Sequence, residues 1–324
     1  FFISWFKCYY RLFNYIRHTD SEVIHIEWIN KYFSIFEEIF LTILYKKYNK
    51  KIIFKVHDID SNVLLNSKGK FNLKISFSKK FFYKRIDGFI AHNNFVKKIL
   101  VSYGIDKEKI SVIPHGINNY VKYENYSKEE SKSFLNLPQN AKVVLFFGNI
   151  SPYKNLESIL KLFSDIDLGD NVYLVVAGKF RRGLKQYRQK IMSLINKSKN
   201  NNRILFHDHF INNEDIEKYF AASDLLCLPY KFIFQSGVLF LSYAMGLPVL
   251  AKKVGGISED IKEGVTGYTY EKDEELESKL QLMLNDNKLK RGKELRDFCE
   301  NHYCWNNIIN DTIKVYSKNK KQIN

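Results

Sequence analysis

The chain has 324 residues, 45% hydrophobic and 27% charged, so it can fill two ordinary domains and is neither disordered nor fibrous. Lys and Arg exceed Asp and Glu by 16 charges, which predicts an acidic partner or surface. Its four cysteines form no CxxC pair, which argues against a zinc knuckle or a disulfide framework and favours a cytosolic protein. No apolar run in the sequence approaches the roughly 18 residues that span a bilayer.

Short apolar runs alternate with longer amphipathic ones, the pattern of a parallel sheet covered by helices. The first third predicts strands and helices in turn, the strands at 23–29, 52–57, 88–92 and 110–114 and the helices at 32–48, 71–85 and 95–103. A polar, tyrosine-rich stretch then predicts a linker over 118–140, with a short helix at 128–137. Because the chain begins with Phe, we expect its N-terminal domain to lack the first strand, helix and strand.

The alternation restarts after the linker. Strands are predicted at 143–148, 172–177, 204–207, 225–229 and 248–251, and helices at 155–163, 184–197, 214–221, 236–245 and from 274 to 316. The predicted class is therefore α/β, with two doubly wound, Rossmann-like domains facing a cleft. We place the domains at 1–117 and 141–302, the linker at 118–140, and a C-terminal helix and basic tail at 303–324. Ligands in such folds bind at the carboxyl ends of the strands.

The string KVVLFFGNISPYKNL opens the second half with a buried strand, then Gly148 and Asn149, then a turn that holds Lys154 before a helix. A glycine at a strand end lets the backbone approach a ligand, and the N–H groups of a helix start attract anions. Lys154 adds a movable positive charge, so the unit suits a diphosphate. The alternative is an ordinary strand–loop–helix turn with a solvated lysine.

Two further strand ends carry similar residues. In the string YLVVAGKF, Gly178 and Lys179 directly follow the predicted strand. After the strand that ends at Pro229 comes a polar loop and the start of a small-residue helix, with Lys231, Gln235, Ser236 and Gly237. The glycine at this helix start again favours close approach by a phosphate or a sugar, whereas Ser236 could serve only as the helix cap.

Together the strings GNISPYK, VVAGK and LPYKFIFQSGVLFLSYAMGLPVLAKKVGG resemble the donor domain of a GT-B glycosyltransferase of the family 4, or group 1, type. Lys154 matches the lysine that binds the donor diphosphate in that family, whereas Asn149 replaces its arginine. The family's two glutamates before G-x-P are absent, with Ile233 and Leu241 in their places, which leaves retention or inversion open. The loop PYKFIFQSG resembles a bacterial branch that builds exopolysaccharide or capsule.

The resemblance implies a hexosyltransferase that takes a nucleoside-diphosphate sugar as donor and a saccharide, expected to be lipid-linked, as acceptor in cell-surface polysaccharide synthesis. The nucleotide sugar is a substrate, and neither a cofactor nor a metal is expected. The alternatives are a catalytically impaired GT-B protein and a basic protein that binds nucleic acid or a membrane. No RNP, helix-turn-helix or zinc-finger signature occurs in the chain, so we expect no nucleic-acid partner.

The first half supplies the candidate catalytic residues. His57 and Asp58 follow a strand in FKVHDIDSN, and His92 follows the next in GFIAHNNFV. In the resembling family a histidine at the first of these ends touches the donor sugar or phosphate. Asp58 or Asp60 could deprotonate an acceptor hydroxyl, with a turn or a helix cap as the alternative for either. A metal-binding D-x-D reading is set aside, because that motif belongs to a fold with one mixed sheet.

Positive charge gathers in the first third. The segment from Lys68 to Arg85 holds seven basic residues and no acid, and Leu73, Phe77 and Phe81 recur at helical spacing within it. A basic amphipathic helix of this kind is typical of a membrane-surface element, although the Phe stripe could instead face the core. We therefore expect a cytoplasmic protein that lies on the inner, anionic face of the plasma membrane.

Overall fold

The computed structural model describes residues 2–29, 35, 37–57, 59, 76–118, 123–165 and 168–318. The chain divides into two compact units, the first made of Phe1–Pro114 with Asn306–Asn324 and the second of His115–Trp305. The described residues of the predicted linker thus belong to the second unit, whereas the segment after Trp305 belongs to the first. Asp58, Asp60 and residues 61–75 of the predicted basic segment lie outside the described residues.

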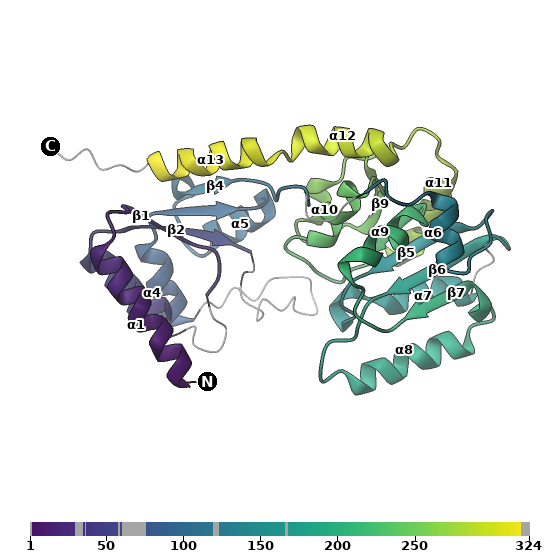
Figure 1. Ribbon diagram of the computed structural model, residues 1–324, viewed down its shortest axis with the longest axis horizontal. Helices are drawn as coiled ribbons and strands as arrows, with labels where there is room; N and C mark the ends of the chain where they lie inside the picture. The colour runs from purple at the N-terminus through teal and green to yellow at the C-terminus, as the bar shows by residue number, and fades with distance from the viewer. Residues whose placement is uncertain are drawn as a thin grey trace. The chain divides into compact units, whose positions relative to one another are not determined.

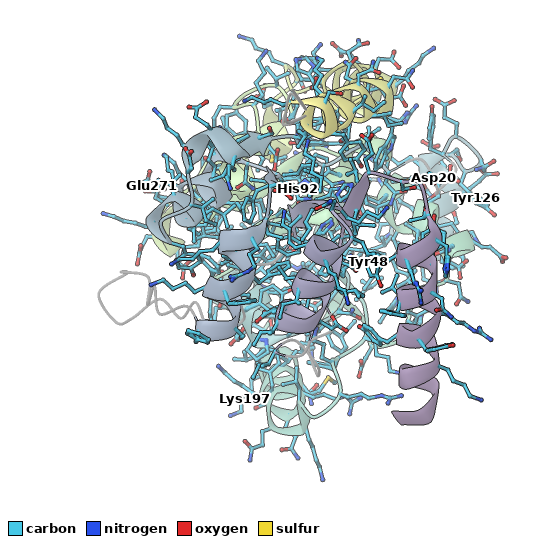
Figure 2. The ribbon with its side chains drawn as sticks, turned by 90° about the vertical axis from the view of Figure 1, so that its left-hand side faces the viewer. Asp20, Tyr48, His92, Tyr126, Lys197 and Glu271 are labelled. Carbon is cyan, nitrogen blue, oxygen red and sulfur yellow. The ribbon has the colours of Figure 1, made fainter. Side chains whose placement is uncertain are left out.

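The first unit is built on a four-stranded sheet, in the order β1-β2-β3-β4, whose neighbouring strands all pair in parallel. Its strands are β1 (Val23–Ile26), β2 (Lys51–Val56), β3 (Gly88–Ala91) and β4 (Ile110–Val112). The central strand β3 is an apolar run that is buried throughout, and β2 has three consecutive buried apolar residues, as a covered parallel sheet requires. The carboxyl ends of all four strands therefore meet at one edge, where His57 and His92 follow β2 and β3 (His92 is labelled in Figure 2).

Helices surround this sheet (Figure 1). They are α1 (Phe2–His18), α3 (Thr42–Lys47), α4 (Phe77–Arg85), α5 (Asn94–Ser102) and α13 (Trp305–Ser317), with a π-helical turn at Glu37–Leu41 and a 3-10 turn at Lys107–Lys109. The side chain of Asn93 caps α5 by accepting a hydrogen bond from the amide of Val96 at 2.9 Å. Lys51 on β2 donates to the carbonyl oxygen of Val315 at 3.3 Å, which joins α13 to the sheet. No helix among the described residues combines the length and apolarity needed to cross a membrane.

The second unit has a six-stranded sheet in the order β10-β9-β8-β5-β6-β7, again with parallel pairing throughout. Its strands are β5 (Lys142–Phe147), β6 (Val172–Ala177), β7 (Ile204–His207), β8 (Leu225–Leu228), β9 (Val249–Lys252) and β10 (Gly267–Tyr270). Its helices are α6 (Lys128–Phe134), α7 (Leu156–Asp165), α8 (Lys185–Lys197), α9 (Asn213–Ala221), α10 (Gly237–Ala244), α11 (Leu276–Asn285) and α12 (Gly292–His302). Two buried apolar clusters form its core, and alternate residues of β5 contribute to each.

Paired charges fix the described part of the predicted linker to the second unit. Lys128, the first residue of α6, donates to Asp224 at 2.5 Å. The side chain of Asn125 donates to Glu217 at 2.7 Å. This segment is therefore part of the packed unit, because side chains that lie about ninety residues further along the chain hold it in place.

The alternation of strands and helices is confirmed, but several details of the prediction are wrong. The edge strand β10 was not predicted. No element was predicted over the first eighteen residues, where the structure has α1, because that stretch mixes basic and apolar side chains. The first strand ends at Ile26 rather than at 29. The single helical stretch predicted from 274 to 316 is three helices, and the second of them begins at Gly292, whose φ is +52° and whose amide donates to the carbonyl of Gly246 at 2.8 Å.

The contact between Gly246 and Gly292 predicts a measurable loss of stability. A Cβ on Gly246 would lie 2.4 Å from the carbonyl oxygen of Gly292, and its φ is +70°. We expect Gly246→Ala to lower the free energy of unfolding by about 2–4 kcal/mol, from backbone strain and the clash together. Gly183→Ala is the matched control, since φ is +83° and nothing lies within 4 Å, so only about 1 kcal/mol should be lost. Equal losses in urea unfolding would contradict the prediction.

Candidate functional site

Two glycine turns meet at the carboxyl edge of the second sheet. Gly148 follows β5 with a φ of +96°, and Gly178 follows β6 with a φ of +151°. The amide of Gly148 donates to the carbonyl oxygen of Ala177 at 2.9 Å. A Cβ on Gly178 would lie only 2.1 Å from the carbonyl oxygen of Gly148. The turns can approach this closely only without side chains, so this edge of the sheet is bare backbone.

Lys154 lies against this bare edge. It ends the 3-10 turn Pro152–Lys154, is only 5% exposed, and donates from Nζ to the carbonyl oxygen of Phe147 at 3.3 Å. A Cβ on Gly148 would lie 2.9 Å from the same nitrogen. Among the described residues no carboxylate forms an ion pair with Lys154. The alternative of a solvated lysine is therefore wrong, and the structure joins Gly148, Gly178 and Lys154 in one site.

The burial of the Lys154 ammonium favours the binding of an anion beside it. Burial, together with the smaller effect of the positive charge of Arg181, lowers its pKa to about 8. A buried ammonium with one neutral acceptor is under-compensated, because a desolvated charge normally needs a counter-charge. A phosphate oxygen beside Nζ would supply that counter-charge.

The start of α10 adjoins the same turns. Val238, in the first turn of this helix, has a methyl group 3.5 Å from the position that a Cβ on Gly148 would take. Ser236 occupies the N-cap position and is 6% exposed, yet its side chain makes no capping hydrogen bond, so the prediction of a pure cap finds no support. Gly237 is exposed, with nothing within 4 Å of an added Cβ. The start of α10 therefore lies beside the turn that Lys154 contacts.

The remaining predicted donor residues lie around this centre. The amide of Lys231 donates to the carbonyl of Tyr153 at 2.7 Å, but its ammonium lies 3.6 Å from the carboxylate of Glu157. Lys179 is exposed, and its carbonyl accepts from Ile150 at 2.8 Å. Asn149, directly after Gly148, is exposed, and Gln235, directly before Ser236, is half-buried.

Glu157 is a residue that sequence reasoning missed. Its carboxylate also accepts from Tyr187 at 2.6 Å and from Lys190 at 3.2 Å. Burial acts to raise its pKa, but the hydrogen bond from Tyr187 and the charge of Lys231 outweigh burial, so the pKa is lowered. Glu157 therefore stays ionised and directs Lys231. An acidic residue three positions after the predicted phosphate lysine was the only signal of it in the sequence.

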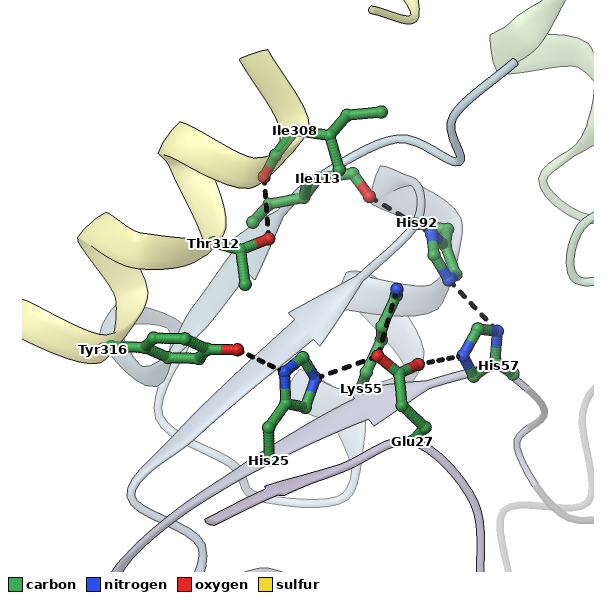
Figure 3. Close-up of polar contacts among 9 residues, drawn as sticks. All are labelled: His25, Glu27, Lys55, His57, His92, Ile113, Ile308, Thr312 and Tyr316. Atoms are coloured by element: carbon green, nitrogen blue, oxygen red, sulfur yellow. Dashed lines mark hydrogen bonds and ion pairs between the residues drawn. The ribbon is translucent and has the colours of Figure 1, made fainter. Parts of the chain in front are cut away.

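A second group of polar residues lies at the carboxyl edge of the first sheet (Figure 3). His57 Nε2 lies 2.7 Å from the carboxylate of Glu27, and His57 Nδ1 lies 3.3 Å from His92 Nε2. His92 Nδ1 lies 3.2 Å from the carbonyl oxygen of Ile113. Lys55 lies 3.4 Å from the other oxygen of Glu27. The structure thus brings the predicted His57 and His92 together and adds Glu27, which was not predicted.

This hydrogen-bond chain engages all four ring nitrogens of the two histidines. The carbonyl of Ile113 and the carboxylate of Glu27 can only accept, so His92 Nδ1 and His57 Nε2 each carry a hydrogen. In this arrangement the histidines orient their surroundings rather than present a nitrogen to a substrate.

Glu27 is the charged centre of this group. Burial acts to raise its pKa, but the hydrogen bond from His57 and the charge of Lys55 outweigh that effect and lower it. His25 lies 3.5 Å from the same carboxylate, and its Nδ1 lies 2.6 Å from the hydroxyl of Tyr316. Burial lowers the pKa of His25, so its ring is neutral at pH 7. Among the described residues no three His, Cys, Asp or Glu side chains gather as metal ligands would.

Two protein-family models match this chain, and several known proteins are similar to it. A family model of glycosyl transferases group 1 matches residues 127–302, and one of glycosyltransferase family 4 matches residues 3–119. The lipopolysaccharide 1,2-N-acetylglucosaminetransferase of Salmonella typhimurium is 25% identical over 68% of this chain, which spans 53% of that relative's length. A 41.2 kDa protein in the cps region of Klebsiella pneumoniae is 21% identical over 93% of this chain and 80% of its own.

The fold is shared with solved structures as well. Anabaena HepE, crystallised in complex with UDP and glucose, superimposes with a TM-score of 0.76 at 17% identity, over 95% of this chain and 81% of that one. At this identity the likeness shows the fold, which is GT-B. Because the group 1 model covers more than half of the chain, including the turns that hold Gly148 and Lys154, the chain belongs to the glycosyl transferases group 1 family.

Proposed function

We propose that this protein is a glycosyltransferase that moves a hexose from a nucleoside-diphosphate sugar to a saccharide acceptor, lipid-linked, in the synthesis of a cell-surface polysaccharide. The observation that carries the proposal is the buried ammonium of Lys154, which forms no ion pair with a described residue, against the bare turns of Gly148 and Gly178. The UDP and glucose of the HepE complex and the names of the Salmonella and Klebsiella relatives support it.

In this proposal the donor diphosphate lies at the carboxyl edge of the second sheet. Lys154 pairs with a phosphate oxygen, and the amide of Gly237 at the start of α10 donates to the same group. These groups stabilise the charge that develops on the departing nucleoside diphosphate. A lysine and a helix start can neutralise this charge, so we expect transfer to proceed without a metal or other cofactor. Asn149, Lys179, Gln235 and Ser236 would complete the donor site.

The first unit supplies the acceptor side. His57 and His92 would act through orientation and charge, since their ring nitrogens bind Glu27, Ile113 and each other. Asp58 remains the proposed base for the acceptor hydroxyl.

Removing the charge of Lys154 should weaken UDP binding and increase the stability of the protein. Lys154→Met keeps the length of the side chain but deletes the buried cation, so we expect UDP to bind about 10- to 100-fold more weakly. The same variant should be more stable to urea by about 1–3 kcal/mol at pH 7, because burial disfavours the ammonium.

Lys197→Met is the matched control for this experiment. Lys197 is the exposed last residue of α8, so its loss should leave stability unchanged and UDP affinity within about threefold. Calorimetric titration with UDP and urea unfolding measure the two effects. If Lys154→Met binds UDP as the wild type does, Lys154 is not the phosphate group.

The lowered pKa of Lys154 predicts how donor binding depends on pH. Below pH 8 the free protein holds the ammonium, and above about pH 8 it loses the proton. UDP affinity should therefore fall by up to about tenfold per pH unit above 8, until the pKa of the complex is passed. Lys154→Met should show no such fall, and a wild-type affinity that stays constant from pH 7 to 10 would contradict this prediction.

We further propose that the first unit attaches to an anionic membrane surface through α4. Phe77 is 81% exposed, whereas Phe82 and Tyr83 are the buried aromatic residues of this helix, so Phe77 does not face the core. Lys80 and Lys84 follow Phe77 at helical spacing and are exposed. Neither lysine forms an ion pair with a described residue. An exposed aromatic beside unpaired cations suits an anionic interface.

Exchange of these residues should release the protein from vesicles. The variant Phe77→Ser, Lys80→Gln and Lys84→Gln should bind phosphatidylglycerol vesicles about 30-fold or more weakly, since each cation near such a surface contributes about 1 kcal/mol. Lys97→Gln with Lys98→Gln on α5 is the charge control and should lose far less. In a sedimentation assay, rising salt concentration should weaken the binding of the wild type to these vesicles. Equal binding by both variants would show that α4 is not the attachment site.

A further inference from the structure

Trp28 is an exposed aromatic side chain at the carboxyl edge of the first sheet. It lies two residues after the end of β1 and is 66% exposed. The other exposed aromatic residues of this unit, such as Tyr15 and Phe77, lie on helices. Because ligands bind at the carboxyl ends of parallel strands, a large apolar ring left in solvent at this edge indicates a binding surface.

One face of this indole is held by the histidine chain. The rings of Trp28 and His57 are stacked, with centroids 4.5 Å apart and planes 9° apart. His57 is fixed in turn by Glu27 at 2.7 Å and by His92 at 3.3 Å, and His92 is only 4% exposed. The indole is thus fixed from behind by an ordered ring, and its exposure leaves the rest of its surface to solvent.

Polar groups lie next to this ring. The side chain of Glu27, the residue before Trp28, is 45% exposed and remains ionised beside Lys55 and His57. A carboxylate can accept about four hydrogen bonds, so Glu27 has capacity left after its present partners. A flat apolar face bordered by a carboxylate is complementary to a pyranose ring, which has C–H groups on one face and hydroxyls around its rim.

We propose that Trp28 is the stacking platform for a pyranose ring of the acceptor, and that Glu27 is the positioning residue that holds this platform through His57. The inference rests on the proposed function and names the acceptor contact that it leaves open. The sugar would lie against the free face of the indole, with its hydroxyls directed to the carboxylate of Glu27.

The direct test follows the indole Nε1–H signal of Trp28 by NMR while the protein, saturated with UDP, is titrated with methyl glycosides of glucose, galactose and N-acetylglucosamine. Trp28→Phe assigns the signal, because it removes that cross-peak alone. We expect the signal to shift with at least one glycoside. We also expect Trp28→Ala to weaken that glycoside about tenfold, and Trp28→Phe to stay within about threefold of the wild type.

Variants of Glu27 test the positioning role. Glu27→Ala should broaden the Trp28 signal and abolish the nuclear Overhauser contact between the Trp28 and His57 rings, whereas Glu27→Gln, which can still accept from His57, should restore both. Tyr15→Ala removes an aromatic residue of similar exposure and should change neither.

The two proposals fail in different ways. No shift of the Trp28 signal with any of the glycosides, or glycoside affinity unchanged in Trp28→Ala, overturns the stacking platform. UDP affinity should be the same in Trp28→Ala and the wild type, since UDP is proposed to bind the second unit. A wild type that does not bind UDP at all would instead overturn the proposed function.

Discussion

A side chain on Gly178 would meet the carbonyl oxygen of Gly148 at 2.1 Å, so the ends of β5 and β6 can lie this close only as bare backbone. The rest of the second unit's site depends on this approach. With no side chain on Gly148, the ammonium of Lys154 occupies the space that a Cβ would need, 2.9 Å from it. The start of α10 reaches the same point. The position of Lys154 against this edge is therefore a consequence of two missing side chains.

The buried charge of Lys154 lowers the stability of the folded protein. Its pKa of about 8 means that the protein holds a charge which its own surroundings disfavour. No described carboxylate relieves this, although Glu157 is near enough to take Lys231. A counter-ion built into the protein would stabilise the fold and would compete with a phosphate. In the proposed site, the unpaired charge lowers the stability of the folded protein and raises its affinity for a phosphate.

The carboxyl edge of the first sheet differs from that of the second, because its charged groups bind one another. Here the described charged groups are paired, because Glu27 binds Lys55 and His57, and His57 binds His92. A satisfied network of this kind is rigid, and rigidity is what an aromatic platform needs if binding is not to cost further ordering. The exposed ring of Trp28 then offers area without being buried against the protein's own core.

The sequence by itself determined the alternation of strands and helices, the glycines that follow β5 and β6, and the lysine in the turn after Gly148, because these depend on local patterns of two to seven residues. It did not reveal Glu27 or Trp28, since an apolar run read to residue 29 placed both inside a strand that ends at Ile26. Nor did it show that Lys154 is buried or that Ser236 makes no capping bond. Only the tertiary structure decides these points, because burial, pairing and stacking are set by residues that lie far apart along the chain and meet when parallel strands align their ends.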